Sequence, residues 1–111
     1  MRNLIAIFIV ALMAVSALAL SGYLKVFVKT YEIKKGSALD KAKCLVCHTD
    51  KAGKKVNRYG ADLQKALREA GTKTLSEKIL SQVENLDSDG DGVKNLAEIK
   101  GDTLPGDPKS K

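Results

Sequence analysis

Both cysteines and the only histidine of this 111-residue chain lie within five consecutive positions, Cys44-Leu45-Val46-Cys47-His48. Packing of a chain does not require that coincidence, whereas several kinds of metal and cofactor chemistry do. The chain after residue 24 is also poor in large apolar groups, because it contains no Trp, no Met and a single Phe. A domain with so small a core usually needs a staple, a metal or a cofactor to be stable.

The spacing Cys-x-x-Cys-His is the attachment motif of c-type haem. The thiols of Cys44 and Cys47 would add to the haem vinyl groups at one porphyrin edge, and His48 would be the proximal iron ligand. A structural zinc site would need a fourth Cys or His, which the chain lacks. A disulfide between Cys44 and Cys47 would stabilise the fold little, because the loop that it closes is very short. A thioredoxin-like redox motif would need a βαβ pattern, which is missing.

The segment GSALDKAKCLVCHTDKAGKKVNRYGADLQKAL resembles small exported mono-haem c-type cytochromes of bacteria, in which an Asn-x-Tyr-Gly follows the CxxCH helix. The resemblance covers roughly residues 36 to 70. It implies a mainly α fold, that is, a small cytochrome c-like helical domain around one covalent haem. It also implies one-electron transfer. No constellation of a catalytic acid, base or nucleophile is visible in the sequence, so the protein is not expected to be an enzyme.

The sixth iron ligand is not evident from the sequence. The only methionines are Met1 and Met13, and His48 is already used, so neither His/Met nor His/His ligation is available within one chain. The distal face would then be open or hold water, or take the free α-amino group that signal cleavage creates. The side chains that could reach it lie in the loop and turn after the motif: Lys54, Lys55, Asn57 and Tyr59. For Tyr59 we favour a packing role with its hydroxyl bonded to a haem propionate or the backbone.

Residues 4–24 are uncharged and almost wholly apolar, and they follow Met1-Arg2-Asn3. At about 1.5 Å per residue such a helix reaches about 31 Å, enough to span a bilayer. Ala17-Leu18-Ala19 offers a small-x-small cleavage site, so residues 1–24 are a signal peptide or a membrane anchor. Either alternative predicts an exported, periplasmic or extracytoplasmic domain. The anchor alternative adds membrane contact.

The segment DSDGDGVKNLAE, residues 87–98, fits the EF-hand calcium loop position by position. The predicted calcium ligands are Asp87, Asp89, Asp91, Val93 through its carbonyl, Asn95 and Glu98. The segment also resembles the DxDGDGxxNxxE loops of exported bacterial proteins, akin to thrombospondin type 3 repeats. Lys94 stands where paired loops carry an apolar residue, which predicts an unpaired loop with a short exiting helix. Calcium would act as a structural brace. The alternative is a flexible acidic turn.

Several helix boundaries follow from local signals. Residues 25–33 read as a short strand or as a continuation of the leader helix, and Ser37 reads as the N-cap of the helix that carries the cysteines. A second helix would bury a stripe of apolar residues and stop at Gly71. A third, over 75–86, would follow a capping box of Thr74 and Glu77. The stripes predicted to be buried are Leu63, Ala66, Leu67 and Ala70, and then Leu75, Ile79, Val83 and Leu86.

Charge divides the exported part into two regions. Residues 25–73, the haem-binding region, carry 13 Lys/Arg against 5 Asp/Glu, whereas residues 74–111, a helix with the calcium loop and tail, carry 5 against 8. The basic region suits docking to an acidic face of a redox partner protein, and nucleic acid is not an expected partner. We therefore expect a one-electron carrier. The rivals are a binder or sensor of a diatomic gas (or weak peroxidase) with an open distal face, and a subunit of a conducting assembly.

Overall fold

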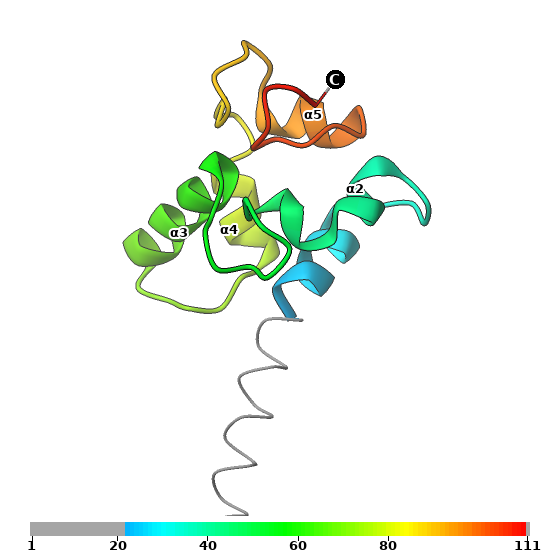
Figure 1. The fold of residues 1–111 in the computed structure, drawn as a ribbon. Coiled ribbons are helices and arrows are strands. Elements are labelled where there is room, and N and C mark those ends of the chain that lie inside the picture. The colour runs from blue at the N-terminus through cyan, green and yellow to red at the C-terminus, as the bar shows by residue number, and fades with distance from the viewer. Residues whose placement is uncertain (1–21, 111) are drawn as a thin grey trace, which may run out of the picture.

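The computed structural model describes residues 22–110, so most of the predicted leader lies outside the described residues. Five helical segments follow residues 22–30, which are helical as well (Figure 1). They are α2 (Ala38–Ala42), the 3₁₀ helix η1 (Lys43–Val46), α3 (Arg58–Ala70), α4 (Glu77–Gln82) and α5 (Asn95–Lys100). Within the described residues the only β pairing is an isolated bridge between His48 and Val56. The prediction of a mainly α fold is confirmed.

The first described helix, residues 22–30, replaces the strand that was one of two alternatives for residues 25–33. The strand prediction was wrong because Phe27 and Tyr31, four residues apart, need the same face of a helix to reach the core. Phe27 is buried and meets the rings of Tyr31 and Tyr59 edge-on, with centroids 5.3 and 6.3 Å away. In the part of the chain from 22 to 110, no helix is long and apolar enough to cross a membrane.

Helix α2 begins at the predicted N-cap. The hydroxyl of Ser37 accepts a hydrogen bond from the backbone N–H of Asp40 at 3.2 Å. The carboxylate of Asp102, 64 residues away from Ala38, accepts from the N–H groups of Ala38 and Leu39 at 2.8 and 3.0 Å. Together these two side chains satisfy three of the free N–H groups at the helix start. The helix that Ser37 caps does not itself carry the cysteines, contrary to the prediction, because the chain tightens into η1 after Ala42. Cys44 lies in η1 and Cys47 directly follows it.

Helix α3 is the longest described helix that is bounded at both ends, and it has clear start and stop signals. The side chain of Asn57 caps its N-terminus by accepting from the N–H of Gly60, and Gly71 ends it in the left-handed conformation at φ 67°. The predicted stop at Gly71 is confirmed, because glycine adopts that conformation without a Cβ clash. Of the predicted stripe, Leu63 and Ala66 are buried, whereas Ala70 is exposed in the last turn.

Helix α4 is shorter than the predicted 75–86 and starts at a different cap. Ser76 rather than Thr74 is the N-cap, since its hydroxyl accepts from the N–H of Ile79 at 3.4 Å. The helix ends at Gln82, and the chain reaches the acidic loop through turns, so that Leu86 is 45% exposed. Both α4 and the exiting helix α5 have six residues, and the latter matches the predicted short exit.

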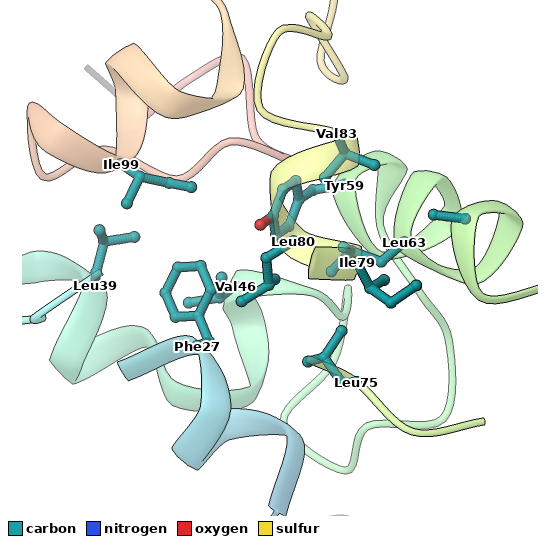
Figure 2. Close-up of a cluster of buried hydrophobic side chains, with 11 residues drawn as sticks. Phe27, Leu39, Val46, Tyr59, Leu63, Leu75, Ile79, Leu80, Val83 and Ile99 are labelled. Carbon is teal, nitrogen blue, oxygen red and sulfur yellow. The ribbon is translucent and has the colours of Figure 1, made fainter. Parts of the chain in front are cut away.

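The core draws one or more side chains from each part of the fold, as Figure 2 shows. Phe27 comes from the first helix, Leu39 from α2, and Ile99 from α5. The centre of the cluster is formed by α3 and α4, and its members there are Tyr59, Leu63, Ala66, Ile79 and Leu80. The haem-binding and calcium-loop regions predicted from the sequence therefore share one hydrophobic core.

Candidate cofactor pocket and acidic loop

Cys44, Cys47 and His48 line the same pocket. Apart from these residues its walls are mainly apolar and come from the first helix, from α3 and from the segment around α4. The other residues that line it include Leu24, Phe27, Val46, Val56, Leu63, Leu67, Leu75 and Leu80. The two thiols and the imidazole thus line one largely apolar space, and this set of donor groups is typical of cofactors that are attached through thioethers and ligated by histidine.

The imidazole of His48 is oriented by the loop that follows it. Its Nδ1 lies 3.2 Å from the carbonyl oxygen of Lys55, and the N–H of Thr49 donates to the same oxygen at 2.9 Å. Because a carbonyl oxygen only accepts, Nδ1 must carry the proton in this contact, which leaves the lone pair on Nε2. This arrangement, with one ring nitrogen bound to a carbonyl and the other free, is typical of histidines that ligate metals.

Asn57 holds the segment between the two cysteines. Its side-chain N–H₂ donates to the carbonyl oxygens of Leu45 and Val46 at 3.2 and 3.0 Å, and its backbone N–H donates to Cys47 at 2.9 Å. Its amide oxygen accepts from Gly60 at 2.9 Å. The N–H groups of Asn57 therefore all bind the CxxCH segment, while its amide oxygen caps the start of α3.

Gly60 is the second residue that fits α3 to this segment. A Cβ at this position would lie 2.1 Å from the carbonyl oxygen of Cys47 and 3.0 Å from Val56. A contact of 2.1 Å with backbone leaves no room for any side chain, so the close approach requires glycine. The Asn-x-Tyr-Gly motif thus has a local structural role: Asn57 binds the CxxCH segment through hydrogen bonds, and Gly60 allows α3 to pack directly against it.

The thiols are free, and that of Cys44 is exposed. Burial, together with the nearby Cys44 thiol, raises the pKa of Cys47 to about 12. Reactive or metal-binding cysteines have a lowered pKa, because the thiolate is the nucleophile and the ligand. Burial therefore favours the neutral thiol of Cys47 over the thiolate.

The four predicted sixth-ligand candidates are not among the residues that line this pocket. Lys54 and Lys55 are exposed in the loop, and Asn57 is used as described above. Tyr59 is fully buried beside Phe27, and burial raises its pKa. Its hydroxyl has no hydrogen-bond partner among the described residues.

Two polar side chains in the pocket were missed by the sequence reasoning, Tyr23 and Gln64. The hydroxyl of Tyr23 donates to the carbonyl oxygen of Lys73. Gln64 lies on the pocket face of α3 with Gly60, Leu63 and Leu67. That helical spacing was the signal that could have found it, if the stripe had been started at Gly60 rather than at Leu63.

The acidic loop brings its three aspartates together. Ligand oxygens of Asp87, Asp89 and Asp91 lie within 4.8 Å of one another. The carboxylate of Asp87 accepts from the N–H groups of Gly90 and Gly92 at 3.0 and 2.8 Å. Both glycines have positive φ, 73° and 90°, and Gly92 stands at the sixth position, where the sharp turn of a calcium loop requires glycine.

Glu98 faces this cluster from α5. It is 3% exposed, yet neither of its carboxylate oxygens has a hydrogen-bond partner in the part of the chain that the structure describes. Burial, and then the neighbouring Asp91 and Asp89, raises its pKa to about 8. Asp89 is also 3% exposed, with Oδ2 unpartnered and its pKa raised chiefly by burial. Buried carboxylates normally carry a partner, and a divalent cation would supply one.

The two remaining predicted ligands are placed differently. Asn95 is fully buried, and its amide is used inside the loop: it accepts from the N–H of Ser88 and donates to Val83 and to the hydroxyl of Ser88. It organises the loop from within. Val93 is 43% exposed, and its N–H donates to Asp91 at 2.9 Å. Asp102, which the tail contributes, is used as the second cap of α2.

Comparison with known protein families, with curated proteins and with solved structures gave no match for this chain.

Proposed function

We propose that this protein is an exported mono-haem c-type cytochrome that acts as a one-electron carrier. The observation that carries the proposal is the convergence of Cys44, Cys47 and His48 on one apolar pocket, with the imidazole held so that Nε2 is free. Bound haem would supply a single iron centre that exchanges one electron. The rest of the site consists of this chain's own side chains, whose work is to attach, orient and shield that group.

Each residue of the site has a distinct task in this proposal. Cys44 and Cys47 would attach haem c, and His48 would ligate its iron through Nε2. The carbonyl oxygen of Lys55 holds the imidazole by its Nδ1 proton, which fixes the ring and increases its basicity. The apolar walls exclude water and lower the local dielectric, which sets the reduction potential together with the axial ligands.

Calcium is the second cofactor that we propose. Asp87, Asp89, Asp91 and Glu98 offer carboxylate oxygens at the positions of a calcium loop, and the unpartnered oxygens of Glu98 are what supports a cation there. Outside the cytoplasm, millimolar calcium would keep a site of weak or moderate affinity mostly filled. Calcium would therefore brace the turn between α4 and α5.

A second candidate function is supported by the composition of the pocket. Among the described residues, residues 22–110, its lining contains no Met, no Lys and no second His, so none of these residues offers a strong sixth ligand to the space that His48 lines. An iron with an open face binds diatomic gases. The protein would then be a gas binder or sensor, or a weak peroxidase.

The absorption spectrum separates these two functions. The sample is the protein exported from cells that mature c-type haem, measured oxidised, reduced, and reduced with carbon monoxide. A low-spin spectrum that carbon monoxide leaves unchanged is the result expected of the electron carrier. A high-spin spectrum that carbon monoxide shifts would replace it by the gas binder, and a colourless exported protein would refute both.

The proposed partner and location follow from charge and from the leader. The basic region, residues 25–73, would dock transiently to an acidic face of a redox partner. Association should then slow steeply as salt is raised, since exposed charges separated by more than about 8 Å are screened at physiological ionic strength. An equal rate at low and high salt would refute this docking mode.

A further inference from the structure

The first turns of α3 are bonded to the acidic loop. The guanidinium Nη1 of Arg58 donates to the backbone carbonyl oxygen of Asp89 at 3.0 Å. The hydroxyl of Ser88 donates to the carboxylate of Asp62 at 2.6 Å. Arg58 and Asp62 are four residues apart, so both contacts lie on the same face of the helix. These two bonds tie the loop at its second and third positions to α3.

The same turns of α3 are bonded to the CxxCH segment. Asn57, the N-cap, donates to Leu45, Val46 and Cys47, as described above. Gly60 lies directly against the carbonyl of Cys47. Four contacts join residues 57–60, at the start of α3, to the CxxCH segment. A displacement of the start of α3 should therefore also displace the CxxCH segment.

A second connection runs through the chain after α5. Asp102 caps α2 through Ala38 and Leu39, immediately before the cysteines. Gly106 lies so close to Asn57 that a Cβ there would be 2.4 Å from its amide oxygen. The segment that follows Glu98 therefore also contacts Asn57, the residue that binds the CxxCH segment.

We propose that calcium bound by residues 87–98 tunes the haem site through α3, with Arg58 and Asp62 as positioning residues. The proposal rests on the proposed function, since it assumes both cofactors. Without the cation the carboxylates of the loop repel one another, which displaces Ser88 and Asp89 and loosens their bonds to α3. The start of α3, and with it the segment that carries Cys47 and His48, then relaxes.

Two consequences have a definite sign. Relaxation of the segment that carries Cys47 and His48 admits water to the haem pocket, which favours the oxidised haem because it carries one positive charge more than the reduced haem. Removal of calcium should therefore lower the midpoint potential. By linkage the reduced protein should bind calcium more tightly than the oxidised protein. Couplings between sites in one domain are typically about fivefold or more in affinity.

The test uses the full haem-loaded protein. Its midpoint potential and absorption spectrum are measured with millimolar calcium and again with a calcium chelator, and calcium binding is followed by calorimetry in both redox states. We expect a lower potential and an altered spectrum without calcium, and about fivefold tighter calcium binding to the reduced protein.

Three variants locate the coupling on α3. Arg58→Gln removes the donor to Asp89 but keeps every proposed calcium ligand, so it should still bind calcium while losing most of the calcium-dependent shift. Arg58→Lys keeps a cationic donor and should restore part of that shift. Arg68→Gln makes the same change in the exposed last part of the helix and should behave as the wild type. A thermal melt verifies that each variant is folded.

The outcomes separate this inference from the proposed function. Calcium that binds without changing the potential or the spectrum of the wild type overturns the inference and leaves the two cofactors standing. So does a shift that survives intact in Arg58→Gln. A colourless protein, or one without calcium binding, refutes the proposed function and the inference with it.

Discussion

Replacement of Glu98 by Gln should stabilise the calcium-free protein and abolish the response to calcium. Wild-type Glu98 is buried beside Asp91 and Asp89, and burial first and these carboxylates second raise its pKa from its usual 4.5 to about 8. Between about pH 4.5 and pH 8, the Glu98 carboxyl is ionised in the unfolded chain but still protonated in the folded protein. Stability of the calcium-free protein is therefore fully present below about pH 4.5 and is lost as the pH rises toward about 8.

The size of this penalty can be bounded. At about 1.4 kcal/mol per pH unit, the raised pKa corresponds to a ceiling of about 5 kcal/mol. A buried glutamine amide without partners costs about 1–3 kcal/mol, which Glu98→Gln would retain. The calcium-free variant should therefore be more stable than calcium-free wild type by about 2 kcal/mol at pH 8, and not at pH 5.

With calcium bound, the wild type should become more stable than Glu98→Gln at pH 8. A ligand at about 100 times its Kd stabilises the folded state by about 2.7 kcal/mol, and loops of extracellular modules have Kd values of about 10⁻⁴–10⁻³ M. About 10 mM calcium should thus stabilise the wild type by up to that amount. Glu98→Gln, which lacks the bidentate ligand, should gain little.

The assay is urea denaturation of the haem-loaded protein, followed by circular dichroism at pH 5 and pH 8 in calcium-stripped and calcium-containing buffer. Glu69→Gln, an exposed acid near the end of α3, controls for the loss of one negative charge. Two results would refute the reasoning. One is an equal gain from calcium in Glu98→Gln and wild type, and the other is a calcium-free wild type whose stability does not fall between pH 5 and 8.

Three further predictions concern the start of α3. Gly60→Ala should prevent most covalent haem attachment, because its Cβ would lie 2.1 Å from the Cys47 carbonyl oxygen; haem per mole of exported protein measures this, and a normal content would contradict the close contact. Asn57→Ala should lower the free energy of unfolding by about 3 kcal/mol, from the lost cap and two lost donors. Asn57→Ser keeps a hydroxyl that can cap the helix and should lose less in the same urea titration. Tyr59→Phe should leave the absorption spectrum unchanged, since the hydroxyl does not line the pocket, and a change of spin state would reinstate Tyr59 as a ligand.

Local signals predicted the parts of the fold that local interactions determine. Ser37 and Gly71 were predictable because a cap and a left-handed stop depend on a few neighbouring residues. The start of α4 was not, since Thr74 and Ser76 are both good caps and the burial of Leu75, Ile79 and Val83, which the spacing did predict, does not distinguish between them. Which of the two hydroxyls caps the helix depends on how the chain enters α4 after the turn that follows α3.

The same distinction holds for the sites. The five residues 44–48 and the twelve residues 87–98 are contiguous, so their patterns could be recognised in the sequence. The contacts that connect the two sites could not be predicted from the sequence. The bonds of Arg58 to Asp89 and of Asp62 to Ser88 join residues more than twenty positions apart. Gln64 was overlooked for a related reason, because its exposed, polar character suggested solvent until the pocket beside α3 was described.

The bond between Asp102 and the start of α2 has a consequence for the order of events during folding. It joins residues 63 and 64 positions apart, so it forms only after a large part of the chain has been brought together. Contacts of such long range are slow to form, because the loop they close must first lose its conformational freedom. Until that bond forms, Cys44 and Cys47 lie in an open peptide that is not yet held by the later part of the chain. Under the proposed function, this interval is the period in which haem can be attached to the thiols, and a chain that ends before Asp102 should extend it.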